Sequence, residues 1–184
     1  MSFLQLTEND NSQMYIKHGW HTGYFMVGDD MIEVTHFMLD TNFKTGYGKF
    51  EDGQYYYRWD EQQGAGNPDK DKLLADGDKR AVEAPMYIKG KGNYVWQRFS
   101  QNEAQAFDDA MSKAWQSKPA TGDQVPVFEY TGSKKVQAGQ SKGFVPLIEF
   151  VKWQERPAEF VNMSLDTGGQ EDENNTPLED DIPF

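Results

Sequence analysis

The sequence contains no cysteine. A disulfide framework, a thiolate nucleophile and a thiolate-bound metal are therefore excluded, which fits a reducing cytoplasm. No apolar run approaches the roughly 20 residues that a membrane span needs. Residues 1–13 have neither the basic start nor the apolar run of a signal peptide. We therefore expect a cytoplasmic protein that has no contact with a membrane.

Positive charge is also scarce, because 18 Lys and Arg face 30 Asp and Glu, which gives a net charge of −12. Residues 164–184 hold seven acids and no base, and residues 1–163 therefore carry −5. A site for a polyanion in this body would need positive charge segregated on one face. Aromatic residues are abundant at 14%. Aromatic rings can stack on nucleic-acid bases without reading sequence, for about 1–3 kcal/mol per base.

Catalytic signatures are missing as well. The chain has no Walker-type glycine loop, no G-x-S-x-G and no H-E-x-x-H. His18 and His21 have a spacing that two metal ligands can use, but they and His36 have neither a cysteine nor an acid-rich strand beside them. The acidic stretch Asn67–Asp78 lacks the spacing of an EF-hand loop. We expect no enzyme activity, no metal and no cofactor.

The C-terminal segment Ser164–Phe184 is acidic and almost free of apolar residues until its last three. Such a segment cannot bury enough apolar surface to offset the entropy of ordering, so we expect it to be disordered. The predicted organisation is a folded domain over residues 1–163 and a tail over 164–184. An acidic tail that ends in an apolar tip with a free carboxylate is typical of a docking peptide.

This tip resembles the C-terminus of bacterial single-stranded DNA-binding proteins, and of phage and plasmid proteins with that function. The residues that carry the resemblance are Asp180, Asp181, Ile182, Pro183 and Phe184. The likeness covers the tip and its acidic segment, about a tenth of the chain, and the body has no motif to align with the family. It implies a divergent phage or mobile-element member in a bacterial host cell. Its tail would recruit replication, recombination and repair proteins, and a homo-oligomer would be possible.

The N-terminal third predicts strands. Trp20–Val27 and Met31–Leu39 are rich in β-branched and aromatic residues, and the Gly28-Asp29-Asp30 turn between them predicts a hairpin. The second strand has apolar residues on both faces, so we expect it to be central. Glycines interrupt Phe43–Phe50, which predicts a bulge or a barrel corner. In Gln54–Trp59, alternation places Tyr55, Tyr57 and Trp59 on one face and Arg58 on the other.

Residues 84–99 are rich in aromatic residues and carry Lys89, Lys91 and Arg98 but no acid. Two glycines divide this run into a predicted hairpin. In its second strand Tyr94, Trp96 and Arg98 share a face, which would supply rings for bases and a cation for phosphate. The alternative is an edge-strand pair with solvent-facing lysines that guard against aggregation.

A helix follows from Ser100, where Ser100 and Glu103 form a capping-box pattern and an apolar stripe begins at Ala104. We expect this helix to be structural. Two further strands, Val125–Thr131 and Phe144–Trp153, flank a loop with Lys134, Lys135 and Lys142 and no acid. We expect this loop to be a flexible finger over a polyanion, with a solvated loop as the alternative. A last strand over Glu159–Met163 would close the sheet edge.

These elements predict a mainly β fold with a late helix and long loops, similar to the small, partly open β-barrel of the oligonucleotide-binding (OB) fold. A β-sandwich would give much the same pattern. The residues expected to bind single-stranded DNA are Tyr55, Tyr57, Arg58, Trp59, Lys89, Lys91, Tyr94, Trp96, Arg98, Lys134, Lys135 and Lys142. The expected function is sequence-tolerant binding of single-stranded DNA. The alternative is an interaction module that presents the tail without binding DNA, and buried Tyr94 and Trp96 would favour it.

Overall fold

The computed structural model describes residues 14–60 and 70–161, which form one curved sheet and two helices. The first strands are β1 (Tyr15–His18), β2 (Phe25–Val27), β3 (Asp30–Ile32), β4 (His36–Leu39), β5 (Lys44–Glu51) and β6 (Gln54–Trp59). Then come α1 (Lys70–Ala75), β7 (Lys79–Ile88), β8 (Gly92–Phe99), α2 (Gln101–Trp115), β9 (Gln124–Ala138) and β10 (Ser141–Glu155). The expected mainly β fold with a late helix is confirmed.

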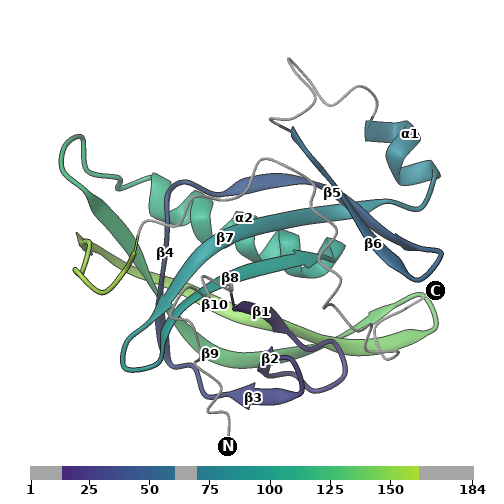
Figure 1. Ribbon diagram of the computed structural model, residues 1–184, viewed down its shortest axis with the longest axis horizontal. Coiled ribbons are helices and arrows are strands. Elements are labelled where there is room, and N and C mark those ends of the chain that lie inside the picture. Colours follow the sequence, from purple (N-terminus) through teal and green to yellow (C-terminus); the bar gives the residue numbers. More distant parts are fainter. Residues whose placement is uncertain (1–13, 61–69, 162–184) are drawn as a thin grey trace, which may run out of the picture.

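Strand pairing gives the order β10-β9-β4-β7-β8-β1-β2-β3, and β5 and β6 branch from β7. β1 and β8 run parallel, and the other pairs are antiparallel. The expected central strand Met31–Leu39 is divided in two. His36–Leu39 form β4 between β9 and β7, whereas Met31 and Ile32 belong to β3 at the end of the order. The predicted N-terminal hairpin is shorter than expected, because β2 and β3 pair over three residues each. No ladder among the described residues joins β10 to β3, so strand pairing leaves the sheet open (Figure 1).

The β1–β2 loop, residues 19–24, brings the far ends of the curved sheet together without a ladder. The carbonyl of Trp20 accepts a hydrogen bond from the Phe144 N–H on β10 at 2.8 Å. The indole N–H of Trp20 donates to Ser141 Oγ at 3.2 Å, and the indole lies where a Cβ on Gly143 would be. Trp20 therefore docks onto β10 and is buried there.

The apolar core lies inside the curve of the sheet, and α2 packs into it against β7, β8 and β10. The buried face of α2 carries Glu103, Ala104, Phe107, Ala110, Met111 and Ala114. The predicted helix start is confirmed, because Ser100 Oγ accepts the Glu103 N–H at 3.4 Å. The capping box is not reciprocal, however. The Ser100 N–H donates to the Arg80 carbonyl instead, and the Glu103 side chain turns into the core.

The Glu103 carboxylate is the polar centre of this core and is 4% exposed. One oxygen accepts the indole N–H of Trp96 at 2.7 Å and the backbone N–H of His18 at 3.1 Å. Arg98 Nε lies 3.4 Å from the other oxygen. A single carboxylate thus connects β1, β8 and α2.

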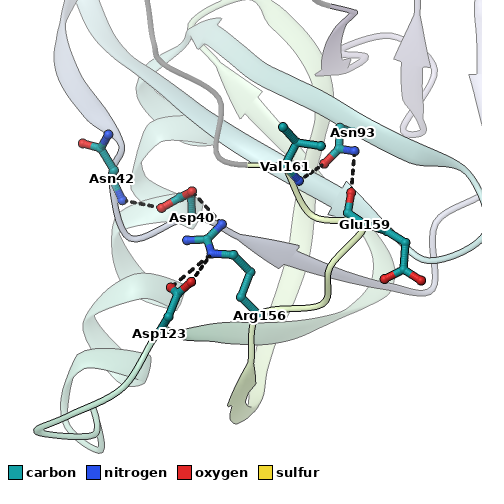
Figure 2. Close-up of polar contacts among 7 residues, drawn as sticks. All are labelled: Asp40, Asn42, Asn93, Asp123, Arg156, Glu159 and Val161. Carbon is teal, nitrogen blue, oxygen red and sulfur yellow. Dashed lines mark hydrogen bonds and ion pairs between the residues drawn. The ribbon is translucent and has the colours of Figure 1, made fainter.

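Residues 156–161, which we call the C-terminal strap, follow β10 and are held by side-chain contacts. Figure 2 shows Arg156 between two carboxylates. Its Nε donates to both oxygens of Asp123 at 3.1 and 2.9 Å, and its Nη1 donates to Asp40 at 2.9 Å. Phe160 is buried beneath and stacks on Tyr87, with ring centroids 5.6 Å apart.

The end of the strap is fixed to the start of β8. The Asn93 side chain donates to the Glu159 carbonyl at 2.8 Å and accepts the Val161 N–H at 3.2 Å (Figure 2). The predicted strand over Glu159–Met163 is wrong for residues 159–161, which form no ladder, because one amide side chain takes the place of a partner strand. Residues 162 and 163 lie outside the described residues.

The predicted loop over residues 132–143 is also wrong. β9 and β10 continue through it as one long hairpin, from Gln124 paired with Glu155 to Ala138 paired with Ser141. Its register shifts at Leu147/Ile148 and again at Phe150/Lys152, and these irregularities bend the hairpin. Neither described helix is long and apolar enough to cross a bilayer.

We expect Glu103→Ala to lower the free energy of unfolding by roughly 3 kcal/mol, because the Trp96 and His18 donors and the Arg98 charge lose their buried partner. Urea unfolding followed by tryptophan fluorescence would measure the loss. Gln101→Ala, at an exposed position of the same helix turn, should change stability by no more than about 0.5 kcal/mol. Equal small losses in both variants would contradict the central role of Glu103.

Candidate nucleic-acid interface

β6 presents a row of aromatic rings on one face of the sheet. Alternation holds as predicted, and Phe50 and Phe99 extend the row beyond β6. The consecutive ring contacts are Phe50–Tyr55 at 4.9 Å, Tyr55–Phe99 at 5.7 Å, Phe99–Tyr57 at 5.8 Å and Tyr57–Trp59 at 5.1 Å. We call these five residues the aromatic row. The sequence reasoning missed Phe50 and Phe99. Phe50 pairs with Tyr55 across the β5–β6 ladder, whereas Phe99 comes from β8, which shares no described ladder with β6.

The glycines of β5 make room for this row. Gly48 pairs with Tyr57, and a Cβ on Gly48 would lie 3.0 Å from the Phe99 side chain. The β5–β6 ladder runs without a register shift. The predicted bulge or barrel corner in Phe43–Phe50 is therefore wrong, and close packing of a ring over the strand explains the glycine.

Members of the aromatic row differ in their access to solvent. Trp59 is 6% exposed and belongs to the core, which removes it from the predicted stacking residues. Phe50, Tyr55, Tyr57 and Phe99 are half-buried. Burial raises the pKa of the Tyr57 hydroxyl far above its usual range, so this ring stays uncharged. Arg58 lies on the opposite face and is half-buried.

The predicted platform on β8 is wrong, because its rings face the core. Tyr94 is 6% exposed and Trp96 is fully buried, with its ring 5.7 Å from that of Phe107 on α2. Arg98 lies on the same face, as alternation predicted, but it is turned toward Glu103. None of these three side chains is placed to contact a base or a phosphate. Helix α2 covers this face, and the pattern of the strand alone does not predict that.

Lys89 and Lys91 are exposed in the turn between β7 and β8. Figure 1 shows this turn at the opposite end of the view from the turn between β9 and β10. The structure therefore does not gather the predicted lysines into one site.

Residues 132–147 form the distal part of the β9–β10 hairpin, which we call the basic arm. Lys134, Lys135 and Lys142 are exposed on it, and no acid lies in this stretch. None of the three forms an ion pair with a residue that the structure describes. In an acidic body, the basic arm is thus a segment where positive charge is segregated from carboxylates.

Polar contacts fix the base of the basic arm to the body. The hydroxyls of Tyr130 and Ser133 lie 2.7 Å apart, and both donate to the Gly23 carbonyl, at 2.8 and 2.6 Å. His18 Nε2 lies 2.8 Å from Ser133 Oγ. The arm is therefore a paired hairpin that is anchored at its base, where the sequence predicted a loop.

His18 is the buried member of this cluster, and no metal is needed to explain it. Burial lowers its pKa to about 4, the hydrogen bond to Gly23 opposes that shift, and the charge of Arg98 adds to it. His21 and His36 are exposed. Across residues 14–60 and 70–161, no three His, Asp or Glu side chains gather into a possible metal site. Sequence reasoning missed the role of His18, because Ser133 lies 115 residues away.

The basic arm carries an open hollow of about 440 Å³, lined by Lys135, Val136, Gln137, Lys142, Gly143 and Phe144. The Lys135 ammonium lies 5.8 Å from the centre of the Phe144 ring. The Phe144 ring rests on Gly23, where a Cβ would lie 3.0 Å from it. An aromatic ring and two ammonium groups thus share one hollow. Sequence reasoning singled out the two lysines and missed Phe144 and Gln137.

The expected partner-binding residues Asp180–Phe184 lie outside the described residues. No protein-family model, curated protein or solved structure matches the chain.

The buried His18 predicts a pH dependence of stability. Its folded pKa of about 4 lies below the unfolded value of 6.5. The unfolded chain therefore binds the proton first as pH falls. The contribution of neutral His18 is complete above pH 6.5 and is lost as pH falls through 4, which amounts to about 3 kcal/mol.

Chemical unfolding between pH 7 and 4 would measure this loss. His18→Gln should lose less stability than the unsubstituted protein over that range. His36→Gln, at an exposed position, should follow the unsubstituted protein. Parallel curves for His18→Gln and the unsubstituted protein would show that His18 does not titrate as proposed.

Proposed function

We propose that this protein binds single-stranded DNA without sequence preference and presents its C-terminal tip to replication, recombination and repair proteins, in the cytoplasm of a bacterial host. The observation that carries the proposal is the basic arm, whose three exposed lysines form an acid-free surface on a body of charge −5. Phosphates bind such a surface by releasing counterions, and this term does not depend on sequence.

The rings available for base stacking differ from those that the sequence predicted. With Tyr94, Trp96 and Trp59 buried, the available rings are Phe144 on the basic arm and the half-buried members of the aromatic row. Stacking on such rings tolerates any base, because every base has a π face. Lysines for the phosphates and rings for the bases support a function of binding without catalysis.

The tip supplies the second half of the proposal. Asp180 and Asp181 precede Ile182, Pro183 and Phe184, and the resemblance to single-stranded DNA-binding proteins rests on these residues. A partner would hold Phe184 in a pocket and pair a basic residue with its carboxylate. The strap gives this segment a fixed origin on the body, because Val161 is held by Asn93.

The salt dependence of binding tests the basic arm. We expect the slope of log K against log salt concentration to fall by about 2 when Lys134, Lys135 and Lys142 are all replaced by Gln, since each single-strand phosphate contact contributes about 0.7. Fluorescence anisotropy of a labelled oligo-dT at roughly 50 to 300 mM salt, where salt effects on binding are large, would give the slope.

A matched control removes three exposed lysines elsewhere, Lys70, Lys113 and Lys118. It has the same net charge as the arm variant and should keep the original slope. Equal slopes in the two triple variants would mean that the arm does not contact phosphate.

A second candidate function is supported by the burial of Tyr94 and Trp96 and by the acidic body. The protein would then be an interaction module that presents its tip to proteins and binds no DNA. The two candidates differ in one measurement, which uses a full-length chain whose seven acids in residues 164–184 are changed to amides.

We expect this neutral-tail variant to bind oligo-dT severalfold more tightly at low salt, because a tethered acidic segment competes with DNA at high effective concentration. A duplex of the same length should bind more weakly. Unchanged affinity would show that the tail does not compete with DNA. No binding of oligo-dT by either protein at low salt would leave the interaction module as the function.

A further inference from the structure

The hollow on the basic arm has a composition that matches one nucleotide unit. Its volume of about 440 Å³ lies in the range of small-ligand sites, roughly 300–1,000 Å³. Lys135 and Lys142 supply ammonium groups, and Phe144 supplies a ring. The Gln137 amide N–H already donates to the Gly139 carbonyl at 3.0 Å, which leaves its oxygen as an acceptor.

The lysines of the hollow converge because of strand register. Gln137 pairs with Lys142 and Lys135 pairs with Phe144, so these four side chains share one face of the hairpin. Lys134, opposite Val145, lies on the other face and does not line the hollow. Two positive charges therefore act together at one place, with no carboxylate among the lining residues.

The hollow is held ready by the body. Phe144 donates its N–H to the Trp20 carbonyl at 2.8 Å, and its ring rests on Gly23. The Trp20 indole donates to Ser141, one residue before Lys142. A site whose walls are fixed before binding loses less entropy when a ligand enters.

Two ammonium groups suit a ligand of charge near −2. A phosphodiester inside a strand carries −1, whereas a terminal phosphomonoester carries about −1.5 to −2 at neutral pH. We infer that this hollow binds the phosphorylated end of a single strand, with the terminal phosphate between Lys135 and Lys142 and the adjoining base on Phe144. This inference rests on the proposed function and adds to it a preference for one kind of strand end.

The test compares oligo-dT strands that carry a 5′-phosphate, a 3′-phosphate or hydroxyls at both ends, each with an internal fluorescent label. We expect the full-length protein to bind one phosphorylated strand about fivefold more tightly than the hydroxyl strand at about 0.1 M salt, as for a pair of partly exposed charges. The better of the two phosphorylated strands identifies the end that is bound. The preference should shrink at pH 5, below the second ionisation of the phosphate near 6.

The matched variants separate this site from general binding. Lys135→Gln with Lys142→Gln should remove the preference for a phosphorylated end, and Lys134→Gln should keep it. Phe144→Leu retains an apolar side chain on Gly23 and should weaken binding of the phosphorylated strand by removing the stacked ring.

The outcomes distinguish the inference from the proposed function. Salt-dependent binding with equal affinity for all three strands would overturn the end site and leave single-strand binding standing. A preference that survives in the Lys135 and Lys142 double variant would place the end site elsewhere and overturn the assignment. No binding of any strand would overturn both.

Discussion

The arrangement of this protein depends on one buried carboxylate. Glu103 lies at the first turn of α2 and accepts hydrogen bonds from Trp96 on β8 and from the backbone of His18 on β1. Burying a carboxylate is favourable only when its partners are all in place. The helix, the parallel β1–β8 pair and the inward side of β8 must therefore form together. The basic arm is attached to β1 as well, because His18 also contacts Ser133.

Local sequence patterns predicted part of the secondary structure. The strand Gln54–Trp59 was predicted with the bounds that it has, and Ser100 marked the start of the helix. Alternation also placed Tyr94, Trp96 and Arg98 on one face correctly. Each of these outcomes depends on residues a few positions apart, where backbone geometry alone fixes the periodicity.

The structural features that the sequence did not predict depend on long-range contacts. Alternation does not say which face of β8 is covered, and α2 covers the face with Trp96. Glycine and lysine between residues 132 and 143 suggested a loop, yet ladder pairing with β10 carries the strand through them. The contacts that hold this hairpin join residues more than 100 positions apart, such as Gly23 with Tyr130. No local pattern in the chain records such a contact.

The outer edge of β10 has a consequence for assembly. A 15-residue strand at the edge of a sheet is a template on which another copy can add a strand. Here Pro146 has no N–H to offer, two register shifts interrupt the ladder, and Lys152 brings an exposed charge. These features discourage propagation of the sheet from one molecule to the next. Self-association by strand addition is therefore less favourable at this edge than at an uninterrupted one.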